Sequence, residues 1–119
     1  MRVVLGKAGK SRVLEDQMKQ LKSERTLLID AVGVKALSQL AGYTIETKSF
    51  AELIATFEHL EKDNDLIGKI ENIVLELNTG IEDTSVLLKW EQRLNKRFFV
   101  TVQDNEMDRI MLFDMTLPE

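Results

Sequence analysis

Short apolar runs alternate along the chain with stretches in which apolar residues recur at helical spacing. The apolar runs predict strands at residues 2–5, 26–29, 43–48, 72–77, 98–102 and 109–113. The helical stretches carry polar residues on their other side and span residues 11–22, 34–41, 50–60 and 84–94. Strands that alternate with helices pair in parallel, because each helix carries the chain back to the start of the next strand.

The order of these elements predicts the fold class. We expect a three-layer α/β fold, with a mainly parallel sheet and helices on both of its faces. The polar segment 104–108 is short and joins the last two predicted strands, so it predicts a hairpin and an antiparallel edge strand at the C-terminus. The length of 119 residues predicts a single domain over residues 1–119.

Composition narrows the classes of function. The sequence has no cysteine, which excludes disulfides, thiol catalysis and cysteine-bound zinc, and its single histidine, His59, excludes a site with several histidine ligands. It has no apolar signal region and no apolar run near the roughly 20 residues of a membrane span, so we expect a cytoplasmic protein without a membrane partner. The net charge of −4 does not indicate nucleic acid as a partner.

The segment with the most specific chemistry joins the first strand to the first helix and reads Gly6, Lys7, Ala8, Gly9, Lys10, Ser11. The first N–H groups of a helix lack backbone partners and lie at the positive end of the helix dipole, so they favour a bound phosphate. Glycines let the backbone wrap around that phosphate. We therefore expect residues 6–11 to bind phosphates, with Lys10 on the terminal phosphates and Ser11 on a magnesium ion.

This segment resembles the Walker A motif of P-loop nucleotide hydrolases, G-x-x-x-x-G-K-[ST]. Gly9, Lys10 and Ser11 match its last three positions. The first glycine of the motif would fall at Val4, whereas this chain has it at Gly6, so the loop is two residues shorter than the motif. The resemblance implies that the chain binds ATP or GTP together with Mg²⁺.

A P-loop site also needs an acidic residue at the end of a neighbouring strand, where it holds the magnesium ion through water. Two of the predicted apolar strands offer such a residue, the second at Asp30 and the fourth at Glu76. Asp has the more usual side chain for this position, and Glu76 has the more usual place along the chain. Asp30, Glu76 and Ser11 are therefore the candidate metal-binding residues.

The order of the segments is similar to that of small recombinase-type P-loop ATPases of phages and mobile elements. The similarity covers residues 2–103 and includes a strand that ends in Leu-Ile-Asp-Ala at 28–31 and a Phe-x-Glu-Leu helix at 50–53, which precedes the Walker B strand. It implies that Asp30 or Glu76 orders a metal-bound water, and that Gln103 at the end of its strand senses the γ-phosphate.

Three functional interpretations stay open. The first is a nucleotide-binding protein that hydrolyses its nucleotide weakly or not at all. The second is a degenerate P-loop domain that binds a protein partner or a second copy of itself, through a surface near Trp90 and Phe99. The third is a receiver-like or other doubly wound domain in which the Gly-Lys-Ser sequence is accidental. For the single residues, Ser11 as a helix cap and Asp30 as a turn cap also stay open. A basic cluster near Arg93 has the charge to act as an arginine finger, which contacts the phosphates bound by a neighbouring subunit. We expect it to stabilise a helix end instead.

Overall fold

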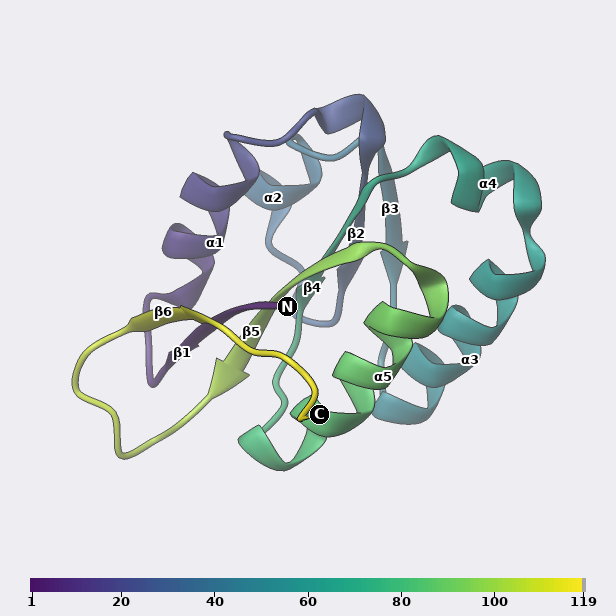
Figure 1. Cartoon of the computed structure of the whole chain (residues 1–119). Helices are drawn as coiled ribbons and strands as arrows, with labels where there is room; N and C mark the ends of the chain where they lie inside the picture. The colour runs from purple at the N-terminus through teal and green to yellow at the C-terminus, as the bar shows by residue number, and fades with distance from the viewer. Residues whose placement is uncertain (119) are drawn as a thin grey trace.

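The computed structural model describes residues 1–118 and has a six-stranded sheet at its centre (Figure 1). The strands are β1 (Arg2–Gly6), β2 (Thr26–Asp30), β3 (Tyr43–Glu46), β4 (Asn72–Glu76), β5 (Arg97–Gln103) and β6 (Met111–Asp114). They follow one another across the sheet in the order β3-β2-β4-β5-β1-β6. The first five strands run parallel, and β6 pairs antiparallel with β1. The predicted mainly parallel sheet with an antiparallel edge at the C-terminal strand is confirmed. The predicted hairpin of the last two strands is wrong, because β1 lies between β5 and β6 and pairs with both of them.

The helices cover both faces of this sheet, as predicted (Figure 1). One face, here called the α1 face, is covered by α1 (Lys10–Met18) and α2 (Lys35–Ser38). The other, here called the α3 face, is covered by α3 (Phe50–Lys62), α4 (Asn64–Lys69) and α5 (Thr84–Leu94). The molecule is therefore a three-layer α/β structure.

Each face of the sheet buries its own apolar cluster. Every residue of β2 and β4 is buried, because these interior strands have helices on both sides. On the α3 face, the Phe57 ring lies 5.4 Å from the Trp90 ring and 5.4 Å from the Phe98 ring, measured between centroids. Trp90 and Phe99 are themselves buried. The prediction of a partner surface near these two residues is therefore wrong, since both side chains belong to the core.

Helices α1 and α2 are shorter than their predicted stretches 11–22 and 34–41, and α4 was not predicted. The sequence pattern did not predict α4, because a helix of six residues is too short to show a period. The Asp63 side chain caps this helix by accepting a hydrogen bond of 3.1 Å from the Leu66 N–H. Helix α1 ends at Met18 rather than at residue 22, and its N-cap is Gly9. Ser11 lies inside the first turn, so it does not cap the helix.

The connections after β2 and β4 leave the sheet in opposite directions. After β2 the chain passes to α2 on the α1 face, and after β4 it passes through a 3₁₀ turn (Ile81–Asp83) to α5 on the α3 face. Neighbouring strands whose connections leave in opposite directions have a crevice at their carboxyl ends, where α/β proteins commonly bind ligands. These strand ends point downward in Figure 1.

Candidate functional site

The β1–α1 loop follows directly from the end of strand β1 at Gly6. Gly9 has φ +83°, in the left-handed region that glycine adopts without strain, and this turn sends the chain straight into α1. The helix has no side-chain cap, so its first N–H groups stay free of a side-chain acceptor. The loop thus has the strand-turn-helix form that a phosphate site requires.

Lys10 folds back into this loop, and only 8% of the residue is exposed. Its Nζ donates hydrogen bonds to the Gly6 carbonyl at 3.1 Å, the Lys7 carbonyl at 3.3 Å and Gln103 Oε1 at 2.5 Å. Burial lowers the pKa of the Lys10 ammonium from its ordinary value, and the nearby Glu76 opposes that change. The ammonium is therefore held at the loop by three oxygen atoms that a phosphate would have to replace in part.

Gln103 connects the loop to the strand beside it. It ends β5 in register with Gly6, and its amide nitrogen donates to the Lys7 carbonyl at 3.0 Å and to Asn105 Oδ1 at 2.7 Å. With its oxygen on Lys10, this one side chain fixes both the loop backbone and the loop cation. Its role as a sensor of the γ-phosphate, which the resemblance implied, stays a prediction.

Glu76 ends β4 and is almost fully buried, with 3% exposed. Its Oε1 accepts a hydrogen bond of 3.3 Å from the Thr101 hydroxyl, while Oε2 is buried without a hydrogen-bond partner of good geometry. Burial raises the pKa of the Glu76 carboxyl, and the nearby hydroxyls of Ser11 and Thr101 oppose this rise. The carboxylate therefore lies beside Ser11 with one oxygen available to a further ligand.

Asp30 ends β2 directly beside Glu76 in the parallel register. Its Oδ1 accepts hydrogen bonds from the Val32 N–H at 2.8 Å and the Gly33 N–H at 2.9 Å. This is the turn-capping role that the sequence left open for Asp30. Asp30 thus adds negative charge next to Glu76 but already uses one of its two oxygen atoms.

The strand ends form a polar row on the α1 face, made of Asp30, Glu76, Thr101 and Gln103. Each of these residues follows an apolar residue that belongs to the core cluster on the α3 face. Because side chains alternate along a strand, all four point to the α1 face. Sequence reasoning missed Thr101, although one threonine between valines in a buried strand was a signal for it.

Ile110, just before β6, lies against the loop. A Cβ atom at Gly6 would come within 3.1 Å of the Ile110 side chain, and one at Gly9 within 3.3 Å. The Asp104 N–H also donates to the Gly6 carbonyl at 3.0 Å, so the segment after β5 is tied to the loop. Sequence reasoning missed this contact, which gives Gly6 a packing role beside any role in phosphate binding.

The protein groups near the loop fit a magnesium ion that is shared with phosphate. Among residues 1–118, no three side chains of the His, Cys, Asp or Glu type come together as a metal site. Magnesium keeps several waters and commonly takes one or two carboxylates together with substrate phosphates. The Ser11 hydroxyl and the unpartnered oxygen of Glu76 match this partial set of ligands.

The basic cluster lies away from the loop. Arg93 pairs with Glu61, with its Nη2 2.8 Å from Glu61 Oε1, and its guanidinium stacks over the Trp90 ring at 4.7 Å. Arg97 begins β5, at the opposite edge of the sheet from the loop. These contacts give both arginines a structural role within their own chain.

Comparisons with known proteins add no relative. A scan against protein-family models, a search of curated proteins and a search of solved structures found no match to this chain. Among the described residues, no helix is both long enough and apolar enough to cross a membrane.

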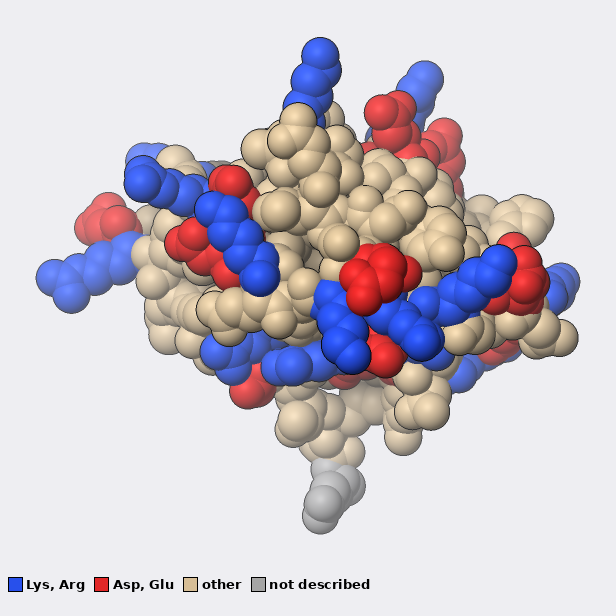
Figure 2. All heavy atoms as spheres, turned by 90° about the horizontal axis from the view of Figure 1, so that it is seen from above, with Lys and Arg blue, Asp and Glu red and all other residues tan. Residues whose placement is uncertain are grey.

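Figure 2 views the molecule from the amino ends of the strands, where Lys and Arg side chains are interspersed with Asp and Glu. That face therefore carries mixed charge rather than a patch of one sign.

Proposed function

We propose that the chain binds the phosphates of ATP or GTP, together with Mg²⁺, at the β1–α1 loop. The observation that carries the proposal is the Glu76 carboxylate, which is buried beside Ser11 and Lys10 with Oε2 unpartnered. A buried carboxylate without a full set of partners costs free energy. A cation held at this oxygen accounts for its retention there.

Each residue of the site has a role in this proposal. The free N–H groups at the start of α1 and the Lys10 ammonium bind the phosphates, while Ser11 and Glu76 hold the metal, Glu76 directly or through water. Asp30 adds charge next to Glu76. The metal ion, when bound, neutralises the charge of the phosphate oxygens.

Calorimetry tests the proposal directly. The protein is titrated with ATP and with GTP, in magnesium and in EDTA, beside Lys10→Ala and Ser11→Ala. We expect magnesium-dependent binding that each substitution weakens by about tenfold or more, since a charge-assisted hydrogen bond contributes roughly 1.5–3 kcal/mol. Lys22→Ala removes an exposed lysine outside the loop and is the matched control. Binding that survives Lys10→Ala unchanged would overturn the proposal.

A second candidate function rests on the edge strand β6. Met111 and Leu112 are 48% and 38% exposed there, on a strand whose outer backbone groups are free to pair with another strand. This arrangement favours self-association through antiparallel pairing of two β6 strands. Light scattering of the purified protein would then give a dimer, and Leu112→Lys would give a monomer. A monomeric wild-type protein would overturn this second candidate.

A further inference from the structure

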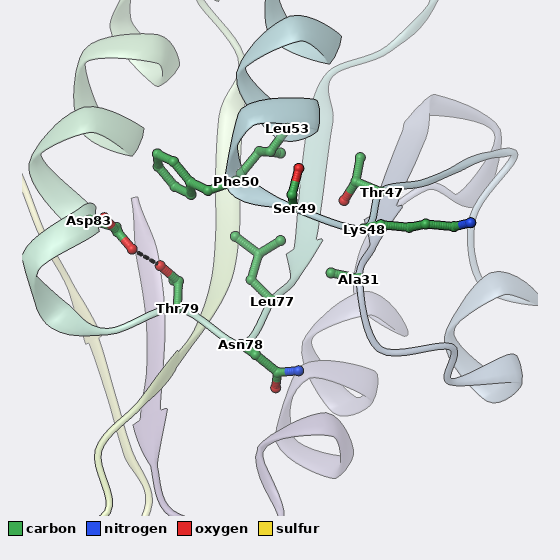
Figure 3. Close-up of a pocket in the computed structure, with 10 residues that line it drawn as sticks. All are labelled: Ala31, Thr47, Lys48, Ser49, Phe50, Leu53, Leu77, Asn78, Thr79 and Asp83. Atoms are coloured by element: carbon green, nitrogen blue, oxygen red, sulfur yellow. Dashed lines mark hydrogen bonds between the residues drawn. The ribbon is translucent and has the colours of Figure 1, made fainter.

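A cavity of about 180 Å³ lies on the α3 face of the sheet, on the opposite side from the polar row (Figure 3). It occupies the place where the connections after β2 and β4 diverge, beside the first turn of α3. Its lining residues are Ala31, Thr47, Lys48, Ser49, Phe50, Leu53, Leu77, Asn78, Thr79 and Asp83. None of them belongs to the β1–α1 loop, so the cavity is a separate feature.

Thr47 supplies an unsatisfied polar group to this cavity. The residue follows strand β3 and is only 5% exposed. Its Oγ1 is buried without a hydrogen-bond partner, and Figure 3 shows the hydroxyl pointing toward the cavity. A buried hydroxyl without a hydrogen-bond partner costs free energy, and nearly all buried polar groups in native proteins have such a partner. A ligand in the cavity would supply the partner that Thr47 lacks.

The remaining polar groups offer both donors and acceptors. Ser49 caps α3, and its oxygen accepts a hydrogen bond of 3.1 Å from the Glu52 N–H, which leaves the hydroxyl proton to be donated. The Thr79 hydroxyl donates to the Asp83 carboxylate on the opposite wall (Figure 3). A ligand that both donates and accepts at each polar atom suits such a set, and hydroxyl groups do both.

The charges around the cavity favour a neutral ligand. The start of α3 contributes partial positive charge, which disfavours a cation. The Asp83 carboxylate on the wall disfavours an anion, and the Lys48 side chain extends away from the cavity in Figure 3. No charge of either sign would therefore be well balanced inside.

Size and apolar surface define the ligand further. A cavity of about 150 Å³ is large enough for benzene, so the roughly 180 Å³ here match the size of a six-membered ring. Phe50, Leu53 and Leu77 form an apolar wall that would contact C–H groups. The ligand thus needs hydroxyl groups at its edge and an apolar ring face.

We propose that this cavity binds a small neutral cyclic polyol, of the monosaccharide class, with Thr47 as a direct hydrogen-bond partner. The site is independent of the β1–α1 loop and does not depend on nucleotide binding. A ring of this class places hydroxyl groups against Thr47, Ser49 and Asn78 and its C–H face against the apolar wall.

The test is an NMR titration of the ¹⁵N-labelled full chain with D-ribose, D-glucose and myo-inositol, beside acetate and ethylammonium. We expect saturable shifts of the amides of residues 47–50 and 77–79 with at least one polyol, in the wild type and equally in Lys10→Ala. The Thr47→Val variant should bind that polyol at least about fivefold more weakly, since it loses the hydrogen bond. It should also melt a few degrees higher, because the unsatisfied hydroxyl is gone.

Matched variants make each outcome decisive. Thr44→Val makes the same change at an exposed position of strand β3, which Thr47 follows, and should leave polyol binding unchanged. Ala31→Leu fills the cavity and should abolish binding. The proposal is overturned if no polyol gives a saturable shift up to roughly 50 mM, which corresponds to a binding free energy weaker than about −2 kcal/mol. Larger shifts with acetate or ethylammonium would overturn it too, as would unchanged affinity in Thr47→Val or Ala31→Leu.

Discussion

The two faces of the sheet differ in the side chains that they bury. On the α3 face, Phe57, Trp90 and Phe98 pack ring against ring, and their burial is explained by stability alone. On the α1 face, Glu76 and Lys10 are buried with desolvated charges, and Glu76 keeps one oxygen unpartnered. The aromatic cluster therefore stabilises the fold. The buried charges on the α1 face lower its stability, and folding does not require them.

The largest expected effect belongs to the apolar face. Phe57→Ala should lower the free energy of unfolding by about 3–5 kcal/mol, because it removes a fully buried ring and leaves a cavity between two aromatic neighbours. Urea denaturation followed by circular dichroism measures this loss. The exposed neighbour Glu58→Ala is the control and should change stability by less than about 0.5 kcal/mol. A loss of under 1 kcal/mol in Phe57→Ala would contradict the assignment of this core, given the ~3–5 kcal/mol scale for such changes.

A pair of glycine substitutions tests the loop backbone. Gly9→Ala should destabilise the protein by about 1–2 kcal/mol, because alanine is strained at the φ of +83° that Gly9 adopts. Gly68→Ala should instead stabilise it by about 0.5–1 kcal/mol, since Gly68 lies in helix α4 with open space around it. Thermal and urea unfolding of the two variants give the comparison. Effects of the same sign would show that the turn at Gly9 is not as described.

The polar face should respond in the opposite direction from the core. Glu76→Gln should raise the free energy of unfolding at neutral pH, because it removes a buried charge that desolvation disfavours. Since the pKa of Glu76 is raised in the folded protein, the native state binds the proton more tightly than the unfolded state. The wild type therefore loses stability as the pH rises from the ordinary value of 4.5 through the raised value.

The pH profile separates this explanation from a general effect of substitution. The advantage of Glu76→Gln should be small below pH 4.5 and should reach a plateau above the raised pKa. Urea midpoints measured across this range, without added metal, give the profile. An advantage that is constant at every pH would mean that ionisation of Glu76 is not its cause.

The smallest expected effect lies on the surface. Arg93→Ala removes an exposed ion pair with Glu61, and solvent screens such pairs. We expect a small fall in urea midpoint, because the guanidinium also stacks over the Trp90 ring. Nucleotide affinity should not change, because Arg93 lies away from the loop. Reduced nucleotide affinity in this variant would restore the arginine-finger interpretation for a neighbouring subunit.

Much of the fold was predictable because the alternation of strands and helices is visible in the sequence. The α/β class, the parallel sheet and the antiparallel edge are confirmed. Helix α4 was missed, since six residues do not establish a helical period. The burial of Trp90 also was not predicted. A helical pattern identifies the apolar face of a helix, but it does not show which element packs against that face.

The candidate site was predictable in its parts rather than in its geometry. The Gly-Lys-Ser spacing and the acids at strand ends identified Lys10, Ser11, Asp30 and Glu76. Their proximity depends on the order of strands across the sheet, which periodicity does not determine. The contact of Ile110 with the loop joins residues about a hundred positions apart, so no local pattern indicated it. Nucleotide binding by these residues stays a prediction.

The most direct test of the central claim combines binding and stability in one variant. Wild type and Glu76→Gln are titrated with ATP in magnesium by calorimetry, and the same samples are unfolded in urea. The account predicts that Glu76→Gln is the more stable protein at neutral pH and binds ATP about tenfold or more weakly, through loss of a metal-holding charge. Equal ATP affinity in the two proteins, or no binding by either, would contradict it.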